Sequence, residues 1–159
     1  MACIVPVPFL VRKIAVCLLS IRFIELYDKS KRIFMFVERN LNPEGKRVGD
    51  CVIRAIAYAL QYTWERAYIE LAIEGFTEYD MPSSNSVWDN YLRKHGFRRY
   101  IAPDTCPDCY TVKDFCNEHP WGVFILATGT HVLVCHNGDY VDSWDSGNEP
   151  IIYFYEKGE

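Results

Sequence analysis

Three residues that lie far apart in the sequence could together carry out nucleophilic catalysis: Cys51, His131 and Asp142. A cysteine attacks a carbonyl group as its thiolate, yet a free thiol has a pKa near ~8.5 and is mostly protonated at neutral pH. A histidine beside the thiol can take this proton and later give it to the leaving group. A carboxylate behind the imidazole fixes its tautomer and stabilises its positive charge. We therefore predict Cys51 as the nucleophile, His131 as the base and Asp142 as the orienting acid.

The sequence around Cys51 places this thiol at the start of a helix. Asp50 is a favoured N-cap residue, and apolar residues recur at three- and four-residue spacing through Cys51–Leu60. The unpaired N–H groups and the dipole at a helix N-terminus favour a negative charge. We therefore count Asp50 as a supporting residue and expect the helix to favour the Cys51 thiolate.

The other two residues lie on a predicted β-hairpin. Asn137-Gly138 separates the apolar runs His131–Cys135 and Tyr140–Trp144. An Asn-Gly pair between two such runs is a strong hairpin signal, because both residues tolerate the positive φ of a type I′ turn. With these two residues in the turn, His136 pairs with Asp139 and Cys135 pairs with Tyr140.

This register decides which acid can reach the histidine. Side chains alternate along a strand, so His131 and Asp142 share a face of the hairpin and lie diagonally across it. Trp144 is predicted to cover the hydrogen bond between them and to exclude water. A slip of one residue would exchange the two faces, which leaves Asp145 as a reserve acid.

The remaining elements follow from start and stop signals in the sequence. Three more helices are predicted: from Thr63 to about Ile73, ended by Gly75; from Ser84 or Ser86 to Gly96; and from the capping-box pair Thr111 and Asp114 to Pro120. Val123–Ala127 and Ile151–Tyr155 read as further strands. Helices that come first and an antiparallel sheet that follows indicate the α+β class.

Two short motifs in this chain resemble papain-like cysteine peptidases. Gly49-Asp50-Cys51 before a helix resembles their nucleophile helix, and Asp142-Ser143-Trp144 resembles the Asn-Ser-Trp segment in which Asn orients the histidine and Trp shields it. The order Cys, His, Asp/Asn is also the papain order. Residues 49–60 with 129–147 are similar to short phage and bacterial cysteine-peptidase-like proteins that combine a GDC helix with a later His and an Asp-x-Trp-Asp run. The resemblance covers residues 40–155 and implies a papain-like fold.

The resemblance also implies a reaction, namely acyl transfer through a thioester on Cys51 without a cofactor. The expected activity is hydrolysis of a peptide or isopeptide amide in a peptide or protein substrate. Two alternatives stay open. An acyltransferase or transglutaminase-like enzyme would use the same Cys-His-Asp triad with an amine in place of water, and an inactive papain-like module would only bind a peptide.

One feature departs from the papain pattern. Papain-type enzymes usually carry a Gln about six residues before the cysteine as an oxyanion donor, but that position is Gly45 here and residues 1–60 contain no Gln. The Cys51 backbone N–H can serve as one oxyanion donor. A second donor could come from Asn42 or Asn40 if the preceding loop folds back.

A cluster of cysteines in the second half of the chain raises the question of a metal. Four potential zinc ligands lie close together in the sequence: Cys106, Cys109, Cys116 and His119. A second CxxC is missing, and no thioredoxin-like pattern surrounds the first one. We therefore favour a turn with small buried residues over a zinc-binding interaction module.

Composition limits the partners of the chain. Half of its 159 residues are apolar and the net charge is −4, which gives no electrostatic reason to expect nucleic acid. An odd count of seven cysteines without a clear secretory signal favours reduced thiols and a cytoplasmic setting. The apolar runs Ala2–Val11 and Ile14–Ile21 are shorter than the ~20 residues that span a bilayer, so no membrane is expected. No feature of the sequence specifies an oligomeric state.

The composition changes near Met35. Residues 1–34 are apolar and basic, with Glu25 and Asp28 as their acids, whereas the following residues have an ordinary globular composition. We interpret residues 35–159 as the cysteine-nucleophile domain. Residues 1–34 are then an N-terminal extension, or alternatively a helix or strand packed on the core.

Overall fold

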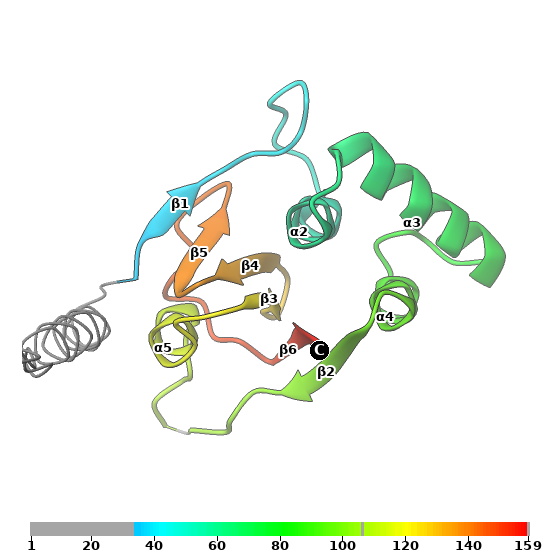
Figure 1. The fold of residues 1–159 in the computed structure, drawn as a ribbon. Helices are drawn as coiled ribbons and strands as arrows, with labels where there is room; N and C mark the ends of the chain where they lie inside the picture. Colours follow the sequence, from blue (N-terminus) through cyan, green and yellow to red (C-terminus); the bar gives the residue numbers. More distant parts are fainter. Residues whose placement is uncertain (1–33, 106, 159) are drawn as a thin grey trace, which may run out of the picture. The chain divides into compact units, whose positions relative to one another are not determined.

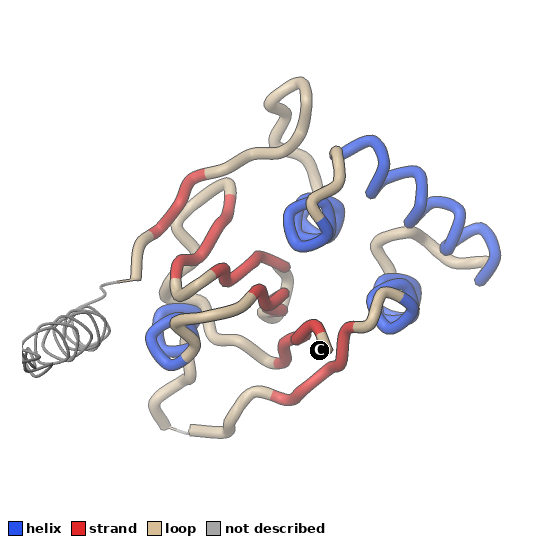
Figure 2. The backbone as a smooth tube through the Cα atoms, in the orientation of Figure 1, coloured by secondary structure: helices blue, strands red, loops and turns tan. Residues whose placement is uncertain are grey.

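The computed structural model describes residues 34–105 and 107–158. The prediction for residues 1–34 falls almost wholly outside this part of the chain. Within it, helices and strands form a six-stranded sheet flanked by four helices (Figures 1 and 2). In chain order the elements are β1 Phe36–Glu38, α2 Cys51–Leu60, α3 Trp64–Glu78, α4 Asn85–Lys94, β2 Phe97–Ile101, α5 Val112–Glu118, β3 Val123–Ala127, β4 Val132–His136, β5 Asp139–Asp142 and β6 Tyr153–Lys157.

The strands of the sheet lie in the order β1-β5-β4-β3-β6-β2. All neighbours are antiparallel except β1, which pairs with β5 in parallel. The α+β class is thereby confirmed, but the sheet is mixed and larger than predicted because β1 and β2 were missed. β1 has only three residues, and four of the five residues of β2 are exposed, so neither strand shows the alternation that marks a half-buried strand.

Helices cover both faces of this sheet. Alternate residues of β3 and β4 enter two separate clusters: Ile125 and Val134 pack with α2 and α4, whereas Leu126 and Leu133 pack with α5. Successive residues of a strand point to opposite faces, so α5 lies on one side and α2 and α4 on the other, as Figure 1 shows. α3 packs on α2 and α4 and forms an outer layer. The N-terminus of α2 is thus held against the face of the sheet that carries Val132.

The hairpin that carries His131 and Asp142 has the predicted register. Cys135 pairs with Tyr140 and His136 with Asp139. Asn137 and Gly138 have φ values of 53° and 84°, which a type I′ turn requires of both residues. The preference of Asn137 and Gly138 for positive φ therefore explains the register between β4 and β5.

The helix starts agree with the predictions, and one helix end does not. α2 begins at Cys51, and α5 has the predicted capping box between Thr111 and Asp114. α3 continues past Gly75 and ends at Tyr79 in the left-handed conformation. Gly75 has another role, because a Cβ there would lie 2.6 Å from the Asp80 carbonyl oxygen. It lets the chain fold back onto α3 rather than ending the helix.

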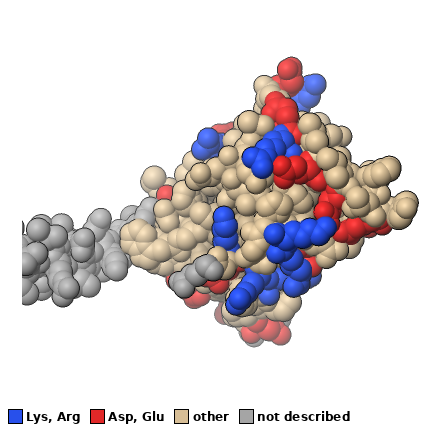
Figure 3. Space-filling model, turned by 45° about the vertical axis from the view of Figure 1, so that its right-hand side comes forward, with Lys and Arg blue, Asp and Glu red and all other residues tan. Residues whose placement is uncertain are grey.

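Charged side chains of both signs lie beside one another on the face drawn in Figure 3. On α3 and α4 they form three ion pairs: Arg66–Glu70, Arg93–Asp89 and Lys94–Glu74. In each pair the basic side chain is more than half exposed, and ion pairs that reach solvent in this way usually contribute at most about 1 kcal/mol. Among the described residues, none of the helices has the length and the apolar character that crossing a membrane would need.

Candidate active site

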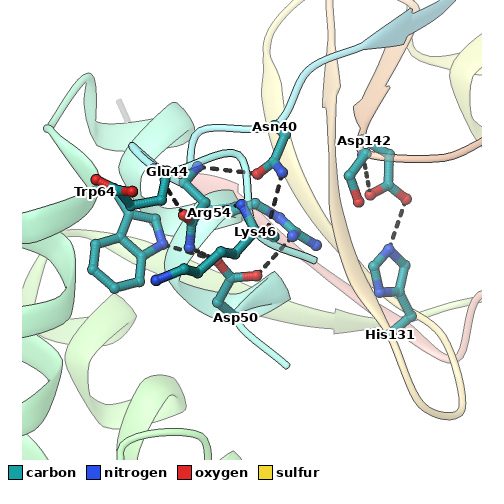
Figure 4. A network of polar contacts seen from close by, with 10 residues as sticks. Asn40, Glu44, Lys46, Asp50, Arg54, Trp64, His131 and Asp142 are labelled. Atoms are coloured by element: carbon teal, nitrogen blue, oxygen red, sulfur yellow. Dashed lines mark hydrogen bonds and ion pairs between the residues drawn. The ribbon is translucent and has the colours of Figure 1, made fainter. Parts of the chain in front are cut away.

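Cys51 is the first residue of α2, and Asp50 precedes it as the N-cap. The Asp50 side chain does not cap the helix; its buried carboxylate accepts hydrogen bonds from three other side chains (Figure 4). These donors are Arg54 Nη1 at 2.6 Å, Trp64 Nε1 at 2.9 Å and Asn42 Nδ2 at 3.1 Å. Asp50 therefore ties α2 to α3 and to the loop before Cys51. Because the Asp50 carboxylate binds these three side chains, it does not accept from the backbone N–H groups in the first turn of α2. These N–H groups remain available to other acceptors.

The surroundings of Cys51 favour its thiolate. Burial by itself raises the pKa of the thiol, but hydrogen bonds from the His131 side chain and the Val132 backbone outweigh this effect. The charge of His131 and the Val52 N–H also lower the pKa, so that it lies below its ordinary value. The thiol is thus held between α2 and the start of β4.

His131 contacts Asp142 on its other side. His131 Nε2 lies 2.6 Å from Asp142 Oδ2, which leaves Nδ1 as the ring nitrogen available to the Cys51 thiol. Burial lowers the pKa of His131, but the hydrogen bonds to Asp142 and Cys51 and the negative charge of both groups raise it to about 9. The lowered thiol pKa and the raised imidazole pKa both favour a thiolate–imidazolium pair over two neutral groups.

Asp142 is fixed by groups that sequence reasoning missed. Its Oδ2 accepts a hydrogen bond from Ser146 Oγ at 2.6 Å, and its Oδ1 accepts one from the Ser143 N–H at 2.7 Å. Ser146 is fully buried. On the strand side, the Asp142 carbonyl oxygen accepts from the Arg39 N–H that follows β1. The carboxylate and the backbone of Asp142 are therefore both held in place, and no local sequence pattern reveals this.

Trp144 lies beside the histidine, whereas Asp145 is used elsewhere. The ring centroids of Trp144 and His131 are 5.2 Å apart, and the Trp144 side chain remains 42% exposed. Trp144 thus lies against the imidazole while part of its own ring faces solvent. Asp145 Oδ1 accepts from Tyr140 Oη at 2.6 Å and from the Gly147 N–H at 3.1 Å, and these bonds keep its pKa low. The structure thus brings Asp142, and not Asp145, to His131.

Asn42 and Asn40 are engaged within their own loop. Asn42 is buried; its amide donates to Asp50, and its Oδ1 accepts from the N–H groups of Glu44 and Lys46. Asn40 Nδ2 donates to the Lys46 carbonyl oxygen. Asn42 and Asn40, the candidates for a second oxyanion donor, each use their side-chain amide to bond within the loop before Cys51.

The cysteine cluster does not converge on a metal site within the described residues. Cys109 is exposed, whereas Cys116 is buried and contacts Cys135 across the interface between α5 and β4. His119 stacks on Phe115 at 3.8 Å between ring centroids. Residues 34–105 and 107–158 contain no group of three potential metal ligands, and Cys106 lies outside them. In the described part of the chain Cys116 and His119 pack in the core or against it, whereas Cys109 is exposed and departs from the predicted turn of small buried residues.

The two acids near the hairpin can be distinguished by the titration of His131. We expect Asp142→Asn to lower the pKa of His131 below about 9, because the substitution removes a negative charge and a charge-assisted hydrogen bond. Asp145→Asn is the matched control and should leave the His131 titration unchanged. NMR of the imidazole resonances as a function of pH measures both. The opposite pattern would mean that Asp145 is the orienting acid.

Comparison with known proteins gave no match for this chain. The chain matches no family model, and no curated protein or solved structure is detectably similar to it. The interpretation of the site therefore depends on its own geometry. Within that geometry, His131 bonds to the buried Asp142, and it also lowers the pKa of the Cys51 thiol.

Proposed function

We propose that this protein is a cysteine-dependent hydrolase that cleaves peptide or isopeptide amide bonds through a thioester on Cys51. The observation that supports it most is His131, which bonds to the buried Asp142 at 2.6 Å and lowers the pKa of the Cys51 thiol. A nucleophile, a base and an orienting group in hydrogen-bond contact are what covalent acyl transfer requires.

The reaction follows from the positions of these groups. The Cys51 thiolate attacks the carbonyl carbon, and the Cys51 N–H at the start of α2 donates to the resulting oxyanion. His131 gives its proton to the leaving amine as the C–N bond breaks and the thioester forms. A water molecule then attacks the thioester while His131 takes up a proton from it, and the Cys51 thiolate leaves as the carboxylic acid forms, which restores the thiolate–imidazolium pair. Asp142 stays ionised throughout and stabilises the imidazolium.

A papain-like fold is part of this proposal. In its support, a helix with the nucleophile at its N-terminus packs on a sheet whose hairpin carries the histidine and the acid. The chain order Cys51, His131, Asp142 is also that of the resemblance. Among the described residues, Cys51, Cys109, Cys116 and Cys135 are free thiols, which suits the proposed cytoplasmic setting.

A pocket formed by the loop before Cys51 and by α2 and α3 suggests what the substrate carries, although no triad residue lines it. A cavity of about 420 Å³ opens next to Gly49 and Asp50. Apolar and aromatic side chains form most of its wall: Pro43, Val48, Ile53, Trp64 and Tyr68. Trp64 and Tyr68 stack with their ring centroids 5.1 Å apart. We therefore assign to this pocket an apolar side chain of the peptide near the bond that is cleaved.

The loop before Cys51 supports a second candidate, an inactive module that binds peptides. Because Asn42 and Asn40 are engaged within the loop, the oxyanion site has the Cys51 N–H without the expected side-chain donor. Removal of one oxyanion donor costs about 10²–10³ in kcat in enzymes of this type. Such a protein would bind peptides and release them uncut.

A peptide library separates these functions. We expect the parent protein to cleave peptides with an apolar residue near the scissile bond and Cys51→Ala to bind the same peptides without cleaving them, since its pocket is intact. Mass spectrometry of the products, with and without methylamine, gives the result. Free carboxylates indicate hydrolysis, and methylamides indicate the acyltransferase alternative. Peptides that bind the parent protein but stay uncut would contradict the hydrolase and support the binding module.

A further inference from the structure

A second cavity lies at the other end of α2. Its volume is about 350 Å³, within the range of ~300–1,000 Å³ that is usual for small-molecule sites. Polar side chains around it include Arg39, Tyr58, Gln61 and His136. Tyr58 is seven residues after Cys51, which places it about 10 Å along the helix axis and nearly on the same side of α2. The cavity contains none of the three triad residues.

The histidine at this cavity is oriented by a tyrosine. Tyr58 Oη lies 2.9 Å from His136 Nδ1, and the two rings meet edge to face at 5.7 Å between centroids. If Tyr58 donates this hydrogen bond, the proton of the neutral imidazole is on Nε2. Nε2 then offers an N–H donor, and no other group in the described part of the chain bonds to it.

Arg39 brings a positive charge to the same cavity. Its guanidinium carbon lies 5.4 Å from the centroid of the Tyr58 ring, and no carboxylate within the described ranges pairs with it. The neighbouring Arg47 instead faces Glu38 at 3.8 Å. The backbone of Arg39 is fixed by its N–H, which donates to the Asp142 carbonyl oxygen at 2.6 Å. The guanidinium is thus available for a ligand while its backbone stays in place.

Two features of the surroundings bear on the charge of a ligand. The C-terminus of α2 lies here and disfavours an anion, but the Gln61 and Tyr62 N–H groups bond to the Tyr58 and Ala57 carbonyl oxygens and satisfy them. Asp139 pairs with His136 in the sheet, yet it is not part of the cavity wall, and its Oδ1 accepts from the Met35 N–H.

We propose that this cavity binds a carboxylate carried on a planar or apolar body. Arg39 would hold the carboxylate as a guanidinium fork, with Nε2 of His136 and the Gln61 amide as further donors. The rest of the ligand would lie against Leu41, Ala57 and Val123. This site goes beyond the proposed hydrolase, and its occupation does not depend on the chemistry of Cys51.

Titration of the full chain with sodium benzoate tests the site directly. We expect saturable NMR shifts of the His136 imidazole and of the Arg39 side chain, and none with the neutral analogue benzamide. Arg39→Gln should weaken benzoate at least about tenfold, the share expected of one charge-assisted hydrogen bond. Arg47→Gln removes an exposed arginine from the same loop region and should leave the affinity unchanged.

A second ligand distinguishes two sources of the carboxylate. N-acetylglutamate α-amide carries the group on a peptide body, so tighter binding than benzoate assigns the site to an acidic peptide side chain. Tighter binding of benzoate assigns it to a free planar acid. The proposal is overturned if neither compound shifts His136 up to about 10 mM, a concentration that would show even very weak binding. It is also overturned if benzamide binds as well as benzoate, or if Arg39→Gln binds benzoate like the parent.

Discussion

Iodoacetamide should alkylate Cys51 with an apparent pKa below the ~8.5 of a free thiol, and His131→Ala should abolish this advantage. In the parent protein the His131 side chain and the Val132 N–H outweigh the effect of burial on the thiol. Without the imidazole, burial dominates and the pKa rises. Because each pKa unit is a factor of ten in thiolate fraction, we expect alkylation at pH 6.5 to slow at least about tenfold in the variant.

The two pKa shifts also define the pH range of the ion pair. As pH rises through the lowered pKa of Cys51, the thiolate forms and alkylation becomes faster. As pH rises further through about 9, His131 loses its proton and the pair becomes a thiolate beside a neutral imidazole. Peptide cleavage, which needs the imidazolium proton for the leaving amine, should therefore fall above about pH 9 even though alkylation does not.

Peptide mapping by mass spectrometry provides the internal control for this experiment. Cys109 is an exposed thiol of the same chain and reports the reactivity of the reagent in both proteins. The parent and the His131→Ala variant should differ at Cys51 and agree at Cys109. Identical pH profiles at Cys51 would show that no ion pair forms, and the peptide-binding module would then replace the hydrolase as the proposed function.

We expect Asp50→Ala to destabilise the protein by about 3–5 kcal/mol, the usual cost of removing one partner from a buried ion pair. Arg54 is buried as well, so the substitution leaves its guanidinium without the carboxylate that lies 2.6 Å away. Trp64 and Asn42 lose the same acceptor. Chemical denaturation followed by tryptophan fluorescence or circular dichroism measures the loss.

Two further variants show whether the buried charge is the cause. In Asp50→Ala with Arg54→Met, the unpaired cation is gone, so this double variant should be more stable than Asp50→Ala alone. Arg66→Ala breaks a pair with Glu70 in which the arginine is 54% exposed, and it should cost less than about 1 kcal/mol. If Asp50→Ala costs no more than Arg66→Ala, the Asp50 network does not hold the loop to α2.

The parts of this structure that the sequence predicts well are those with a local cause. The start of α2 follows from Asp50 and the apolar periodicity after it, and the hairpin register follows from Asn137-Gly138. Both depend on contacts between residues that are close in the chain. The juxtaposition of His131 and Asp142 is then a geometric consequence of the register, so the amino-acid sequence alone is enough to predict it.

The missed features depend on contacts that no local pattern encodes. β1 is held by β5, about 100 residues later in the chain, and contributes only three residues. Ser146 reaches Asp142 through a turn whose shape depends on Tyr140 and Asp145. The sequence contains a hint of the role of Asp50, because Arg54 follows it at the four-residue spacing of helical ion pairs. An acidic residue at the N-cap position can form an ion pair with an arginine four residues later instead of capping the helix.

The position of β6 within the sheet has a consequence for the growing polypeptide on the ribosome. β6 lies between β3 and β2, so the sheet that supports the hairpin cannot close before residues 153–157 have been synthesised. Roughly 100 residues separate Cys51 from this strand, which corresponds to about 5–20 s of translation. For most of this interval His131 has not yet been synthesised, so Cys51 lacks the imidazole that lowers the pKa of its thiol. We therefore expect the Cys51 thiol to gain its reactivity late in synthesis, once His131 is in place beside it.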